Sequence, residues 1–194
     1  MCTFLSSQNP ALVVAGLQVL LEIVRKYEYK EARDLKSLEP VIHSTYPLML
    51  QLLSHCVANP VPETGEAART ICKIVYTTIS FNLPKPLRNP ATLQPWIQAL
   101  LHVVSMPIPA DPVQRDPAEK HKFSWWNAKK WACLCLNRLF ERYGNEAASG
   151  HIVGKREKAE MKEFGKVFYF SFSVRSFVVL FSNTIRLSTP KSSP

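Results

Sequence analysis

The chain has 194 residues, of which 46% are hydrophobic, so it can bury a sizeable core, and disorder throughout is excluded. It carries 24 Lys and Arg against 15 Asp and Glu, and this net charge of +9 favours acidic partners such as nucleic acid, anionic lipid or acidic protein surfaces. The five cysteines show no disulfide-framework spacing and no signal peptide is recognised, so we expect a reducing, intracellular compartment. The most apolar stretch, residues 167–181, is too short for a transmembrane helix and has Arg175 at its centre.

Amphipathic helices dominate the first three quarters of the chain. Apolar residues recur at spacings of three and four, and Pro-rich segments at residues 59–66, 81–90 and 106–117 interrupt the pattern. The predicted helices cover residues 11–29, 40–57, 65–81, 91–105 and 118–143. We place Pro40 in the first turn of the second helix, where a proline is tolerated.

The predicted helices also repeat. Every second one starts near residue 10, 65 or 118, a spacing of fifty-odd residues, whereas HEAT repeats usually have a period of about 40–47. Either the Pro-rich loops lengthen the repeat or the periodicity is fortuitous. We favour the first alternative and predict an all-α fold, an α-solenoid of HEAT-like helical hairpins over residues 1–147.

The composition changes after this region, and we assign residues 148–194 to a charged linker, a Phe-rich segment and a disordered tail. Residues 168–175 alternate apolar and polar side chains, which is the period of a strand. A strand in an all-helical chain would have no partner. We therefore hypothesise that the sequence from about Gly165 is an abnormal ending, such as translated intron or a frameshift.

The sequence does not match the motifs that are typical of catalytic or metal-binding sites. Gly150 and Gly154 are too close together for a phosphate-binding loop, and Arg156 stands where that loop needs Ser or Thr. Cys133 and Cys135 are two apart on a predicted helix, so they point to nearly opposite faces and cannot share a metal ion. We therefore expect no enzyme activity, no catalytic residues, no cofactor and no metal.

Residues 125–131 interleave tryptophans with lysines. One interpretation is a nucleic-acid surface with stacking platforms. The other is a helix that packs its aromatic side chains inward while its lysines stay in water, and we favour it because the basic charge is spread over several helices. Lys129 and Lys130 are then the first candidates for a surface contact. The expected structural core residues are Trp125, Trp126, Trp131, Leu139, Phe140 and Tyr143.

Three stretches resemble one family in order and separation. They are RKYEYK at 25–30, ICKIVYTTISFNLPKPL at 71–87 and WWNAKKWACLCLNRLFERYGN at 125–145. They look like an internal part of importin-β-type nuclear transport receptors, the karyopherin-β family, and are most similar to its importin seven and importin eight branch. The resemblance covers roughly residues 10–147.

The resemblance implies HEAT-repeat architecture, an armadillo-type fold, and transport of protein cargo through the nuclear pore under Ran-GTP control. The implied partners are cargo proteins, the Ran GTPase and nucleoporin Phe-Gly repeats, with no membrane and no enzymatic site. The implied location is the nucleus and the cytoplasm, between which such receptors shuttle, and the nuclear envelope. The alternative is a basic helical module that binds RNA or acidic protein surfaces directly.

Overall fold

The computed structural model describes Ser7, residues 9–27, 32–81, 83–109, Glu119 and residues 122–143. All the elements in these ranges are helices. They are α2 (Pro10–Lys26), α3 (Ala32–Ala58), α4 (Pro62–Phe81), the short 3-10 helix η1 (Lys85–Leu87), α5 (Pro90–Ser105) and α6 (Ser124–Tyr143).

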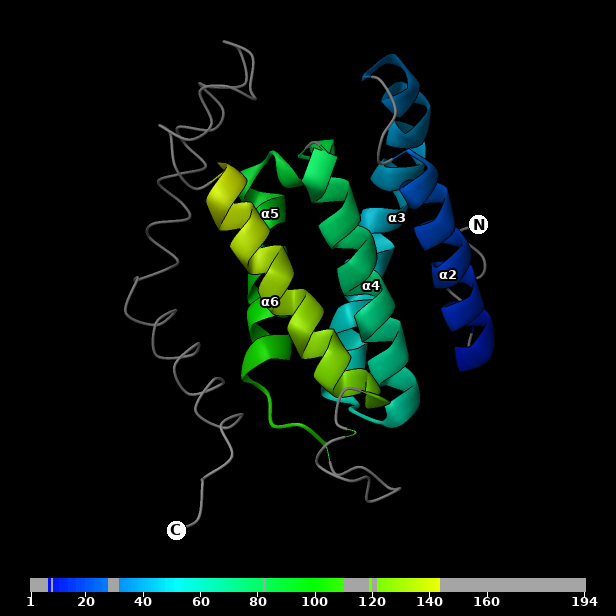
Figure 1. The fold of residues 1–194 in the computed structure, drawn as a ribbon, viewed down its shortest axis with the longest axis vertical. Coiled ribbons are helices and arrows are strands. Elements are labelled where there is room, and N and C mark those ends of the chain that lie inside the picture. The colour runs from blue at the N-terminus through cyan, green and yellow to red at the C-terminus, as the bar shows by residue number, and fades with distance from the viewer. Residues whose placement is uncertain are drawn as a thin grey trace.

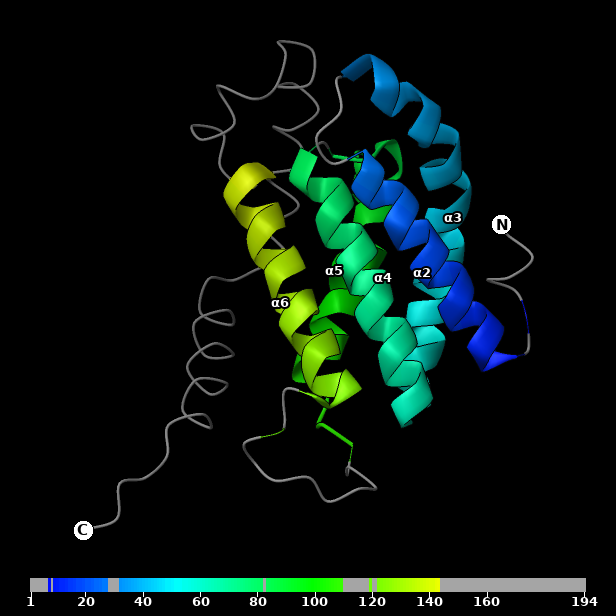
Figure 2. The ribbon, with the colours of Figure 1, turned by 45° about the vertical axis from the view of Figure 1, so that its right-hand side comes forward.

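The helices form two layers. α4 packs between α2 and α6 in one layer, and α3 packs against α5 in the other. The layers meet where α3 contacts α4 and where α5 contacts α6, and Figures 1 and 2 show α2, α4 and α6 in front of α3 and α5. This is a stack of helical hairpins in which each hairpin contacts its neighbour, so the predicted all-α solenoid is confirmed.

Two helices begin with the same N-terminal cap. Asn9 caps α2 and Asn89 caps α5, and each side-chain oxygen accepts a hydrogen bond from a backbone N–H two residues on, at 3.0 Å and 2.9 Å respectively. A proline follows each asparagine, in the first turn where its missing N–H costs nothing. The Asn-Pro pair therefore fixes both helix starts from local sequence.

The predicted start of the second helix is wrong. α3 begins at Ala32, not near residue 40, and Pro40 and Pro47 lie inside it. An interior proline costs about 3 kcal/mol, because it removes a backbone hydrogen bond and crowds the preceding turn. The buried face of α3, which includes Tyr46 and Leu53, offsets this cost. Figure 2 shows that α3 curves, as expected of a helix that contains prolines.

The start of α6 also differs from the prediction. It begins at Ser124, six residues later than expected, while α4 begins at Pro62, three residues earlier. Successive helices of the front layer therefore start at residues 10, 62 and 124, at intervals of 52 and 62. The repeat is thus real, but its length is uneven, because the long α3 and the connection before α6 both extend it.

Tyr46 of α3 joins three helices in the centre of the core. Its ring is fully buried and lies 5.3 Å, centroid to centroid, from that of Trp96 in α5. Its hydroxyl is hydrogen-bonded to that of Thr78 in α4, which also donates to the carbonyl of Val75 at 2.8 Å. Since the threonine hydrogen is used in this way, the tyrosine is the donor between the two hydroxyls.

Residues 144–194 lie outside the described part of the chain. The predicted strand over residues 168–175, the hypothesis of an abnormal ending from about Gly165 and the expected boundary between residues 147 and 148 all depend on this region. The structure leaves these three expectations untested.

Candidate functional site

Trp125, at the start of α6, is fully buried against the start of α4. Its indole Nε1 donates a hydrogen bond of 2.7 Å to the carbonyl of Val61, and the hydroxyl of Ser124 donates one of 2.9 Å to the carbonyl of Pro62. Gly65 permits this approach, since a Cβ there would lie 2.7 Å from Cδ1 of the tryptophan. The structure thus places Trp125 as a packing residue between two neighbouring hairpins.

The other end of α6 is held against the end of α4. Leu139 and Tyr143 are buried, and the tyrosine hydroxyl donates a hydrogen bond of 2.9 Å to the carbonyl of Ile79. Phe140, which we expected in the core, is instead 42% exposed. Consecutive residues of a helix point about 100° apart, so Phe140 turns outward when Leu139 points inward.

The two adjacent lysines of α6 have different surroundings. Nζ of Lys129 donates a hydrogen bond of 2.7 Å to the carbonyl of Val104 in the last turn of α5. Its side chain is half-buried, and this burial lowers the pKa of Lys129. Lys129 therefore caps the carbonyl end of α5, a usual role for a cation at that position. Lys130 is exposed and remains the surface candidate, while Trp126 is half-buried beside the core.

Four partly exposed side chains of α4 and α6 form one cluster, which we call the cation–aromatic ridge: Lys73, Tyr76, Trp131 and Arg138. Nζ of Lys73 lies 5.2 Å from the ring centroid of Trp131, and the guanidinium carbon of Arg138 lies 5.1 Å from that of Tyr76. The two rings meet at 67° with their centroids 5.4 Å apart. Arg138 also donates a hydrogen bond of 2.6 Å to the tyrosine hydroxyl. Both cations are therefore held in defined positions at the protein surface.

Other cations surround Lys73. The pKa of Lys73 is lowered, first by burial and then by the positive charges of Arg69 and Arg25, with a smaller contribution of the same sign from Lys130. Glu66 acts in the opposite direction. The positive field at the ridge thus comes from all three helices of the front layer.

The two arginines beside Lys73 already have partners. Arg25 forms an ion pair of 2.8 Å with Glu22, and Arg69 forms one with Glu66. By contrast, the two cations of the ridge take part in no ion pair within the residues that the structure describes. Among the described residues, the ridge therefore presents positive charge that no ion pair neutralises.

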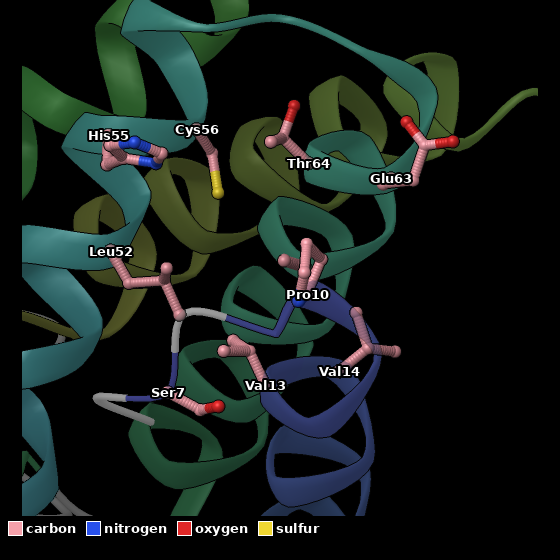
Figure 3. Close-up of a pocket in the computed structure, with 10 residues that line it drawn as sticks. Ser7, Pro10, Val13, Val14, Leu52, His55, Cys56, Glu63 and Thr64 are labelled. Atoms are coloured by element: carbon pink, nitrogen blue, oxygen red, sulfur yellow. The ribbon is translucent and has the colours of Figure 1, made fainter. Parts of the chain in front are cut away.

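A separate groove of about 430 Å³ lies where the start of α2 meets the end of α3 and the start of α4 (Figure 3). Its wall is mostly apolar, with Val13, Val14 and Leu52 prominent. Figure 3 shows the imidazole of His55 and the carboxylate of Glu63 on opposite sides of the groove. The groove therefore suits an apolar side chain better than a reacting group.

The described ranges contain no group of three or more His, Cys, Asp or Glu side chains placed to hold a metal ion. In the same ranges, no helix is both long enough and apolar enough to cross a bilayer.

Comparison with known proteins identifies the family. The chain is 30% identical to the importin beta-like SAD2 homolog of Arabidopsis thaliana over 165 residues, which is 84% of this chain. It is 28% identical to importin-8 of Mus musculus over 161 residues, 83% of this chain, and 23% identical to a probable importin-7 homolog of Dictyostelium discoideum over 180 residues, 92% of this chain. The chain belongs to the importin-β family. The resemblance seen in the sequence is thus confirmed.

The chain spans only 15–16% of the length of these importin-β relatives. The alignments extend further along the chain than the expected residues 10–147, since residues 1–147 make up about 76% of its 194 residues and the Dictyostelium alignment covers 92%. No protein-family model matches the chain, and no solved structure matches it.

Proposed function

We propose that the chain is part of a nuclear transport receptor, which carries protein cargo through the nuclear pore under the control of Ran-GTP. The observation that carries the proposal is the similarity to importin-8 and the importin beta-like SAD2 homolog over 83% and 84% of the chain. Its partners would be cargo proteins, Ran and nucleoporin Phe-Gly repeats. It would shuttle between nucleus and cytoplasm and concentrate at the nuclear envelope.

Such a protein is a binding scaffold and needs no catalytic residues. In a stack of hairpins each unit contacts only its neighbours, so the array flexes and presents a long surface to a partner. Many weak contacts along that surface combine through effective concentration, which gives tight binding without a single deep pocket. The two-layer stack described above supports this mode of action.

The test is entry of the fluorescently tagged chain into nuclei of permeabilised cells. The control is an inert tagged protein of equal mass. We expect faster entry than the control, rim staining at the envelope, and retention on beads by GTP-loaded Ran more than by GDP-loaded Ran. Entry at the rate of the inert control, with no preference for GTP-loaded Ran, would contradict the proposal for this chain.

A further inference from the structure

We propose that the cation–aromatic ridge, with the exposed Lys130 beside it, binds an acidic segment of a protein partner, whose carboxylates pair with the ridge cations. The setting of this inference, a receptor that meets protein partners, rests on the proposed function. The argument for the site itself rests on the described residues alone.

The first step is charge complementarity. The two arginines whose charges lower the pKa of Lys73 are paired with glutamates, but the two ridge cations form no ion pair with a carboxylate in the described ranges. Lys130 adds a third charge close enough to disfavour the charged form of Lys73. A carboxylate placed among these groups would relieve their mutual repulsion, so binding an anion is favourable at this position.

The second step is the ordering of the cations. Lys73 lies over the ring of Trp131, and Arg138 is fixed by both the ring and the hydroxyl of Tyr76. A side chain that is already ordered loses less conformational entropy when it binds, so more of the interaction appears as affinity. An arginine held in this way also presents its remaining N–H groups to a carboxylate in a fixed geometry.

The third step separates an acidic peptide from RNA. Proteins hold single-stranded RNA by cations that follow its backbone together with open aromatic faces on which its bases stack. In the ridge, a cation lies over each ring, and the edge-to-face contact between Tyr76 and Trp131 takes up further ring surface. The arrangement therefore leaves charge available but little room for stacking, which favours carboxylates over bases.

The experiment is a titration of the full chain into a fluorescein-labelled peptide of alternating Glu and Gly, followed by fluorescence anisotropy. The matched control peptide has Gln in place of every Glu. We expect saturable binding of the acidic peptide alone, weakened by salt because exposed charges are screened. In a proton–nitrogen spectrum, we expect the indole signal of Trp131 to move and that of buried Trp125 to stay.

Variants locate the site. The double substitution Lys73→Gln, Lys130→Gln should weaken binding by about fivefold to tenfold, the range expected for two partly exposed charge pairs. Lys36→Gln, an exposed cation on α3 in the other layer, should change binding by less than about twofold. Lys130→Gln alone tests the site in a variant that keeps the fold, since this side chain is exposed. Circular dichroism confirms that each variant is folded.

Three results of the binding measurements would overturn the inference. They are no saturable binding of the acidic peptide, equal losses in the ridge and Lys36 variants, and a single-stranded oligouridine that binds more tightly than the peptide. Self-association that the double variant abolishes would also overturn it, because a second copy of the chain would then occupy the ridge. If the tagged chain enters nuclei normally but binds no acidic peptide, this inference alone fails and the proposed transport function stands.

Discussion

The indole of Trp125 and the carbonyl of Val61 are joined by a hydrogen bond of 2.7 Å, although 64 residues separate them in sequence. Further along α6, the thiol of Cys135 donates to the carbonyl of Cys72 at 3.1 Å, a separation of 63 residues. At the end of the helix, the Tyr143 hydroxyl reaches a carbonyl 64 residues earlier. α6 and α4 therefore run parallel, and these three hydrogen bonds keep a nearly constant register between them.

Truncation of Trp125 should damage the fold far more than truncation of Trp131. Trp125→Ala removes a fully buried ring and its hydrogen bond, and we expect a loss of about 3–5 kcal/mol in the free energy of unfolding. Trp131→Ala removes a half-buried ring, and we expect about 1–2 kcal/mol. Urea denaturation followed by circular dichroism measures both. Equal losses would show that Trp131 is as important for packing as Trp125.

Gly65→Ala should destabilise the chain although alanine favours helix. The gain in helix propensity is at most about 1 kcal/mol. Against it, the new Cβ would lie 2.5 Å from Oγ of Ser124 and 2.7 Å from Cδ1 of Trp125, and overpacking typically costs about 1–3 kcal/mol. We therefore expect a net loss of about 1–2 kcal/mol in urea denaturation. Adding Ser124→Ala should restore part of it, and a more stable single variant would contradict the packing described.

Lys129→Met and Lys130→Met form a matched pair on adjacent positions of α6. Methionine keeps most of the length of the side chain but cannot donate a hydrogen bond. The first substitution leaves the carbonyl of Val104 without its capping ammonium, so we expect a loss of about 1–2 kcal/mol. The second changes an exposed side chain, and we expect less than about 0.5 kcal/mol. The melting temperatures of the two variants, measured side by side, test this difference. An equal decrease in both variants would mean that Lys129 does not cap α5.

Local rules predicted the elements well. In the described part of the chain, the period of the apolar residues found all five α-helices, and prolines marked the breaks between them. These rules failed at α3, where tertiary packing outweighs the cost of Pro40 and Pro47, and no local signal reveals that compensation. They also failed at Phe140, because the buried face of α6 includes its neighbour Leu139, and Phe140 is one residue too far along the helix to share that face.

The ridge was harder to predict than the core. Lys73 and Tyr76 share one side of α4, and Trp131 and Arg138 share one side of α6, but only the register between the two helices brings the pairs together. That register depends on buried hydrogen bonds such as that of Trp125, which sequence spacing does not show. The interleaved tryptophans and lysines were the one available signal, and of the two lysines that they suggested, Lys129 caps α5 and Lys130 lies exposed beside the ridge.

Removal of residues 148–194 should leave the helical stack intact. We propose that residues 1–147 form one folding unit, since the described core residues lie between Val13 and Tyr143. The chain cut after residue 147 should then unfold within about 0.5 kcal/mol of the full chain, as expected when no packed surface is lost. Urea denaturation of both chains is the measurement. A larger loss would show that the removed residues pack against the repeats and would shift the proposed boundary.

Alkaline pH should destabilise the chain through its buried thiols. Burial raises the pKa of Cys56, Cys72 and Cys135 in the folded chain, whereas in the unfolded chain they ionise near about pH 8.5. Above that pH the unfolded state releases protons that the folded state retains, so the free energy of unfolding falls by up to about 1.4 kcal/mol per pH unit for each thiol. We expect the urea midpoint at pH 10 to lie below that at pH 8. Burial lowers the pKa of Lys129, so this residue acts in the opposite direction in this pH range. The decisive measurement is therefore the pH dependence of the stability of Cys72→Ala, which should be weaker than that of the unmodified chain. An equal slope would show that the Cys72 thiol ionises alike in the folded and unfolded states.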